Sequence, residues 1–134
     1  MYTRFIMTAS AVSMAVAGVG LLFLPQEIQA YFHTAPSATL ALVLQLMGAL
    51  YFAAAATNWM AKGSLIGGIY NRPIVIGNLA HFFSGAAILV KVALSITSAA
   101  ILCLSILYLI FALCFAHLLF RHPVPQQKHA TSFL

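Results

Sequence analysis

The chain has 134 residues, of which 63% are hydrophobic and 5% charged, and its mean hydropathy is +1.04. An ordinary soluble domain is about 25% charged, so this composition excludes soluble globular and disordered proteins. Six Lys and Arg residues against one acidic residue give a formal net charge of +5. These cations are scattered at the ends of apolar segments and form no patch for nucleic acid. The composition predicts an integral membrane protein whose partner is the lipid bilayer.

The first two apolar segments cover residues 5–24 and 38–60, and Pro25 ends the first of them. A transmembrane helix needs about 20 apolar residues to cross about 30 Å of hydrocarbon, so each segment predicts one span. A cleaved signal peptide is the alternative for the first segment. Because the apolar core of a signal peptide has only about 7–15 residues, we expect this segment to be retained as a helix.

A single long apolar run extends over residues 73–120, and Pro73 suits the first turn of its helix. One helix of that length would measure about 72 Å, more than twice the thickness of the hydrocarbon core. The run must therefore fold back, and we place its turn at Ser95-Ile96-Thr97-Ser98. This turn gives a third span over 73–94 and a fourth over 99–120.

The predicted fold class is therefore an all-α integral membrane protein, an antiparallel bundle of four transmembrane helices. One domain over residues 1–121 holds the four spans, and residues 122–134 form a polar tail. An excess of Lys and Arg marks cytoplasmic loops, and only Lys91 lies on the side opposite the termini. We expect a multi-pass protein of the bacterial inner membrane with both termini in the cytoplasm. The cations on the side of the termini are Arg4, Lys62, Arg72, Arg121 and Lys128.

Small residues allow transmembrane helices to approach closely, and they are concentrated in the first three spans. We expect these three spans to form the tight part of the bundle, with Gly85 and Ala53 where the third span meets the second. The fourth span is richer in bulky side chains, so lipid or another subunit is expected to cover it.

The stretch from Asn58 to His81 contains most of the polar side chains that a ligand could use. Asn78 and His81 are three residues apart and share a helix face, with His81 about 12 Å into the membrane. An ionisable residue at that depth is by default a functional-site hypothesis, and an interhelical hydrogen bond is the alternative. The candidate ligand-binding residues are Asn58, Lys62, Arg72, Asn78, His81 and His117.

The loop from Lys62 to Arg72 is rich in glycine and basic, but it lacks the spacing of a P-loop or a dinucleotide-binding turn. Attraction of its cations to anionic lipid headgroups is the simpler expectation, at about 1 kcal/mol per cation.

The cysteine and histidine residues of the spans are of the types that bind metals and haem. Cys103 and Cys114 stand about 16 Å apart on one helix, which excludes a disulfide between them. Cys114, His117 and His81 would be only a partial set of ligands for a soft metal. Haem between His81 and His117 would require both side chains at the same depth in the membrane, and their expected depths differ by about 6 Å. No metal and no cofactor are therefore predicted.

The only carboxylate side chain is Glu27, so paired-acid hydrolysis and a Ser-His-Asp arrangement lack their residues. The first hypothesis is a non-enzymatic protein that binds a lipid-like ligand, or a partner's transmembrane helix, against the cytoplasmic half of spans two and three. The alternative is an oligomeric channel or transporter lined by Asn78 and His81, and a membrane enzyme is third. A second copy of the chain or a partner membrane protein is expected in these hypotheses.

Overall fold

The computed structural model describes residues 2–63, 71–96 and 98–121, which form helices and no strand. Four helices are long and apolar enough to cross a membrane, as expected of a multi-pass membrane protein. The all-helical prediction is confirmed, and each predicted span coincides with one long helix to within three residues at either end. The predicted tail, 122–134, and most of the loop before the third span lie outside the described residues. The long helices are α1 (Tyr2–Phe23), α3 (Ala38–Ala61), α4 (Asn71–Ser95) and α5 (Ala99–Arg121).

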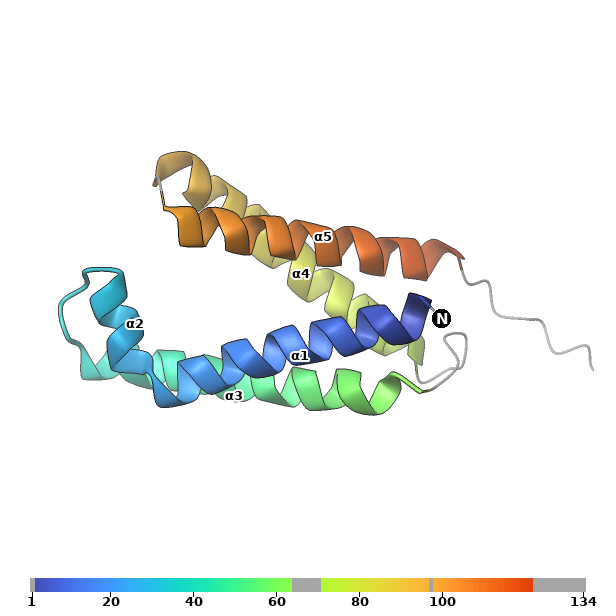
Figure 1. Cartoon of the computed structure of the whole chain (residues 1–134), viewed down its shortest axis with the longest axis horizontal. Helices are drawn as coiled ribbons and strands as arrows, with labels where there is room; N and C mark the ends of the chain where they lie inside the picture. The colour runs from blue at the N-terminus through green and yellow to red at the C-terminus, as the bar shows by residue number, and fades with distance from the viewer. Residues whose placement is uncertain (1, 64–70, 97, 122–134) are drawn as a thin grey trace, which may run out of the picture. The chain divides into compact units, whose positions relative to one another are not determined.

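The helices pack as two compact units, Met1–Ser64 and Leu65–Leu134. In the first unit α1 and α3 lie side by side and antiparallel, and the short helix α2 (Pro25–Tyr31) sits at one end of this pair (Figure 1). In the second unit α4 and α5 form an antiparallel hairpin (Figure 1).

Two glycines bring the backbones of α1 and α3 into contact. A Cβ atom added to Gly18 would lie 2.9 Å from the carbonyl oxygen of Gly48, and one added to Gly48 would lie 2.8 Å from the carbonyl oxygen of Gly18. Such distances leave no room for a side chain on either residue. The close approach expected between the first two spans is therefore present, and it depends on these two positions.

The helix α2 was not predicted from the sequence. Pro25 both follows the end of α1 and occupies the first turn of α2, a position that suits proline because its N–H would have no partner there. The helix ends in a Schellman motif, in which the Thr34 N–H donates to the Gln29 carbonyl and the His33 N–H to the Ala30 carbonyl. His33 takes the left-handed conformation of that motif, with φ of 53°.

The turn between α4 and α5 lies where the sequence predicts it. α4 ends at Ser95 and α5 begins at Ala99, and only Thr97 of this turn is outside the described residues. The Ile96 N–H still donates to the Val92 carbonyl, 2.8 Å away, so α-helical hydrogen bonding continues one residue past Ser95 before the chain reverses.

Gly85 has a different neighbour from the one the sequence suggested. A Cβ atom at this position would collide with the ring of Tyr108 on α5, so Gly85 makes room for an aromatic side chain of the fourth span. Ala53 is exposed within its own unit. The small residue on the third span therefore serves the α4–α5 pairing, because a tyrosine ring needs the space that a missing side chain leaves.

Candidate functional site

An aromatic cluster forms the centre of the α4–α5 unit. Phe82 of α4 is 2% exposed, and its ring stacks on Phe111 with centroids 4.8 Å apart and on Phe115 with centroids 5.7 Å apart. Its edge meets the ring of Tyr108 at 5.2 Å. These contacts come from one α4 residue and from α5 residues spaced three or four apart, which share one face of that helix.

His81 lies at the edge of this aromatic cluster and reaches α5. Its Nε2 atom is 3.3 Å from the Tyr108 hydroxyl oxygen, within hydrogen-bond distance, and the two rings are 5.5 Å apart. The ring of His81 is half-buried, with its edge toward Phe82. The structure thus supplies the interhelical hydrogen bond that the structural hypothesis for His81 requires.

Asn78 is also buried on α4, one turn before His81. Its side-chain nitrogen donates to the Ile74 carbonyl, 2.8 Å away on the same helix, so part of its hydrogen-bonding capacity is used within α4. Asn78 and His81, which the sequence predicts on one face, are buried and half-buried respectively on α4.

An apolar groove of about 430 Å³ runs along the opposite flank of the α4–α5 unit. Consecutive residues of an α-helix are about 100° apart, so Phe83, which lines the groove, points about 160° away from His81. Four alanines provide its space, and larger side chains form its walls. The groove is lined by Leu79, Phe83, Ala86, Ala87, Val90, Leu109, Ala112, Leu113 and Ala116.

In the α1–α3 unit, Asn58 is 1% exposed and faces α1. Its side-chain nitrogen donates to the Ser10 hydroxyl oxygen, 3.2 Å away, and lies 3.7 Å from the Met14 sulfur. The Ser10 hydroxyl in turn donates to the Met7 carbonyl at 3.0 Å. These bonds join α1 to α3, which favours a structural role for Asn58 in this unit.

Lys62 follows α3 directly and lies over the indole of Trp59, with its Nζ atom 2.8 Å from the ring centroid. This arrangement is a cation–π contact. Desolvation, and secondly the positive charge of Arg4, lower the pKa of Lys62 from its ordinary value of 10.5. Arg4 is thus one of the charges that act on Lys62.

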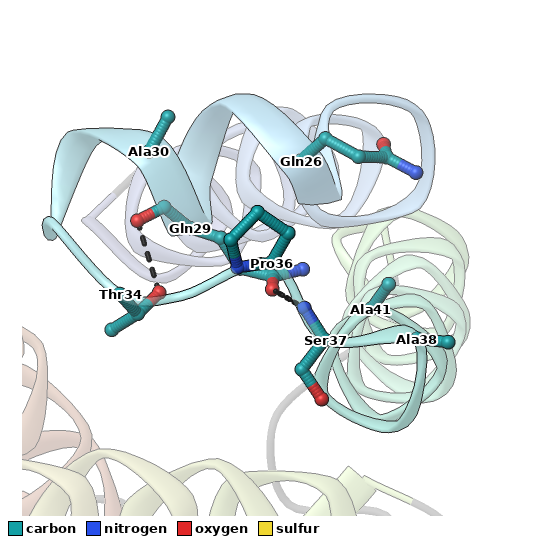
Figure 2. Close-up of a pocket in the computed structure, with 8 residues that line it drawn as sticks. All are labelled: Gln26, Gln29, Ala30, Thr34, Pro36, Ser37, Ala38 and Ala41. Carbon is teal, nitrogen blue, oxygen red and sulfur yellow. Dashed lines mark hydrogen bonds between the residues drawn. The ribbon is translucent and has the colours of Figure 1, made fainter.

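A second hollow, of about 420 Å³, lies between α2 and the start of α3, and Figure 2 shows the side chains around it. Gln29 is buried beside it and holds the loop in place: its side-chain oxygen accepts from the Ser37 N–H at 2.9 Å, and its side-chain nitrogen donates to the Pro25 carbonyl at 3.3 Å. The Thr34 hydroxyl donates to the Gln29 carbonyl (Figure 2). These groups bond to one another, which favours a structural role for the hollow.

The six predicted ligand-binding residues are divided between the two units. Asn58 and Lys62 belong to the first unit, and Arg72, Asn78, His81 and His117 to the second. Arg72 is exposed in the first turn of α4, and His117 is exposed on α5. Within the second unit, the contacts of His81 are with the aromatic cluster on α5.

Cys103 is exposed and Cys114 is half-buried, and both are free thiols. Among the residues that the structure describes, no three His, Cys, Asp or Glu side chains gather closely enough to hold a metal ion.

The sequence did not single out Tyr108 or Gln29 as members of these hydrogen-bond networks. It also did not indicate that Ser10 is the partner of Asn58. Tyr108 does carry a recognisable feature, because a hydroxyl within the apolar stretch of the fourth span needs a hydrogen-bond partner. Gln29 carries no such feature, since a glutamine between two spans is ordinarily solvated.

Comparisons of the chain with protein-family models, with curated proteins and with solved structures found no match.

Proposed function

We propose that this protein is a non-enzymatic, multi-pass membrane protein that binds the acyl tail of a lipid-like ligand in the α4–α5 groove. The observation that carries the proposal is the groove itself, whose lining is apolar throughout and whose space is provided by four alanines. Its volume of about 430 Å³ lies within the range of about 300–1,000 Å³ that is usual for ligand pockets.

The position of the groove along the helices favours an acyl tail. It extends on α4 from Leu79 to Val90, which is about 16 Å at the helical rise, or about half the thickness of a hydrocarbon core of about 30 Å. The middle of this stretch nearly coincides with the middle of the span Arg72–Ser95. A ligand at that depth meets hydrocarbon and no headgroups, so its tail is the part that the groove would hold.

The setting of this proposal is the bacterial inner membrane, with both termini in the cytoplasm. Five of the six Lys and Arg residues support this orientation, since they lie on the side of the termini. Binding is favoured over catalysis because the chain has one carboxylate side chain, Glu27, which belongs to α2 and lies outside the spans.

The test is native mass spectrometry of the full-length protein in mild detergent, followed by extraction and identification of retained lipid. Ala112→Phe and Ala116→Phe place a ring in the groove and should lower the retained lipid severalfold. Ala80→Phe is the matched control, because Ala80 is exposed on α4 and does not line the groove. Ala116→Phe and Ala80→Phe should keep the parent's thermal midpoint, whereas Ala112 is buried, so Ala112→Phe should lose about 1–3 kcal/mol of stability through overpacking.

Two results would overturn the proposal. One is equal lipid retention by the groove variants and the control. The other is a dimer that carries no lipid and dissociates in Ala112→Phe, which would assign the groove to a second copy of the chain.

A further inference from the structure

The end of the α1–α3 unit that carries Arg4 and Lys62 has an unusual charge distribution. The register of the two helices is fixed by Gly18 against Gly48 and Phe52, and by Ser10 against Asn58. In each pair the residue numbers add to between 66 and 70, and those of Arg4 and Lys62 add to 66, so the antiparallel alignment places these two residues within about one helical turn, or about 6 Å, of each other along the axis. The two long side chains therefore share one end of the unit.

No acidic residue is in reach of this pair of cations. The only carboxylate side chain of the chain is Glu27, which belongs to α2 at the other end of the unit. Arg4 lies 19 residues before the end of α1 at Phe23, after which α2 begins, and this is about 29 Å at the helical rise, or several Debye lengths at physiological salt. Repulsion between Arg4 and Lys62 is thus not offset by a protein anion, in agreement with the effect of Arg4 on the Lys62 pKa.

The surroundings of the cation pair are those of the membrane interface. Trp59 is half exposed and lies under the Lys62 ammonium, and tryptophan favours the headgroup region of a bilayer. Beneath it, Asn58 and Met7 are almost fully buried, so the helices below the pair are fixed against each other. The two cations are therefore held at the depth of lipid phosphates by a packed pair of helices.

We propose that Arg4 and Lys62, with Trp59 beside them, form a binding site for the phosphate of an anionic phospholipid headgroup. The phosphate oxygens would accept hydrogen bonds from both cations and remove their mutual repulsion. The indole would lie against the glycerol and upper acyl region of the same lipid. This site belongs to the α1–α3 unit and does not rest on the groove of the α4–α5 unit.

Trp59 provides the measurement, because it is the single tryptophan of the chain. Full-length protein in neutral detergent is titrated with phosphatidylglycerol brominated on its acyl chains, and quenching of Trp59 fluorescence is followed. Phosphatidylcholine with the same brominated chains is the comparison lipid. We expect saturable quenching with phosphatidylglycerol at a concentration about thirtyfold lower, the factor expected from two cations near a membrane surface.

The variants are Arg4→Gln and Lys62→Gln, each of which should weaken phosphatidylglycerol binding about fivefold. Lys62→Arg keeps the charge and should bind like the parent. Lys91→Gln is the matched control, because Lys91 is an exposed cation on α4 outside this unit. Each variant is compared with its own unquenched fluorescence, since Lys62 itself lies over the indole, and circular dichroism checks that each remains helical.

Inorganic phosphate distinguishes a lipid from a soluble anion. At matched ionic strength, sodium phosphate should displace brominated phosphatidylglycerol no better than sodium chloride. Displacement by phosphate alone would assign the site to a free anion and overturn the lipid assignment. Equal quenching by the two lipids, or unchanged binding in both charge-removing variants, would overturn the site itself.

Discussion

His81 shows how one residue's role depends on its partner. An isolated imidazole inside a span suggests proton transfer or ligand binding, whereas an imidazole at 3.3 Å from a tyrosine hydroxyl on the next helix has a hydrogen-bond partner. Burying a polar group without such a partner costs a few kcal/mol. The same reasoning applies to Asn58, whose amide reaches Ser10 on α1. These polar residues join helix pairs, which favours the structural hypothesis for His81.

The prediction at this scale concerns the pair His81 and Tyr108. His81→Leu and Tyr108→Phe each remove the same hydrogen bond, so the double variant should lose less stability than the sum of the two. The expected coupling is about 0.6 kcal/mol, within an upper range of about 1.7 for membrane proteins. Unfolding of the detergent-solubilised protein measures it. His81→Gln should retain the parent's stability, because glutamine also forms hydrogen bonds.

The control for this cycle is His117→Leu, since His117 is an exposed histidine on α5. It should show no coupling to Tyr108→Phe. Strict additivity of His81→Leu and Tyr108→Phe would mean that the hydrogen bond does not stabilise the α4–α5 pair, and that His81 is retained for another purpose.

At the scale of the element, the two helix pairs use different means of association. α1 and α3 approach until their backbones touch at Gly18 and Gly48. α4 and α5 are held by rings, with Phe82 stacked between phenylalanines of α5 and Gly85 making room for Tyr108. In lipid there is little hydrophobic drive for helix association, so each pair depends on the fit of its own contact.

Glycine substitutions in α1 test this account. Gly18→Ala adds a methyl group that would lie 2.9 Å from backbone atoms of α3, and backbone cannot move aside as a flexible side chain can. We expect a loss of about 1–3 kcal/mol, the usual range for overpacking, measured by unfolding in detergent. Gly20→Ala should cause no loss of stability and should gain up to about 1 kcal/mol from the higher helix propensity of alanine, because nothing lies within 4 Å of a Cβ atom at that position.

Equal losses at Gly18 and Gly20 would contradict the role of the Gly18–Gly48 contact. They would indicate that glycine is required at both sites for the backbone of α1 and has no particular relation to α3.

At the scale of the whole molecule, the unequal distribution of Lys and Arg residues between the two ends of the spans predicts the orientation of the chain in the membrane. If all four spans cross the membrane, Arg4, Lys62 and Arg72 are expected on the side of the termini, and Lys91 is the one Lys or Arg expected at the opposite end of a span. Translocation of positively charged loops is disfavoured, so the side with more Lys and Arg stays in the cytoplasm.

Green fluorescent protein fused after Leu134 should fluoresce, because this reporter folds in the cytoplasm and stays dark when it is exported unfolded. An alkaline phosphatase fusion at the same junction should be inactive. A fusion of each reporter between Tyr31 and Ser37, in the opposite loop, is the control and should give the reverse pattern. An active phosphatase at the C-terminus would contradict the orientation.

The sequence by itself determined the all-helical fold class, the number of long apolar helices and the position of the turn between the last two of them. These features follow from a one-dimensional quantity, because bilayer thickness sets the length of an apolar segment and a run of 48 apolar residues must fold back. Hydropathy is thus enough to place each span. It did not reveal α2, since Pro25 ends one helix and begins the next within two residues.

Only the tertiary structure decided which residues meet. Each long helix is apolar on nearly all sides, so its hydrophobic pattern marks no single face for a partner, unlike that of a helix in a soluble protein. The sequence therefore did not indicate which distant residues would form hydrogen bonds, such as His81 with Tyr108 and Asn58 with Ser10. The contact of Gly85 with Tyr108 was not predicted for the same reason. A small residue shows that another helix or side chain can approach closely, but only the packing of the helices determines which one does.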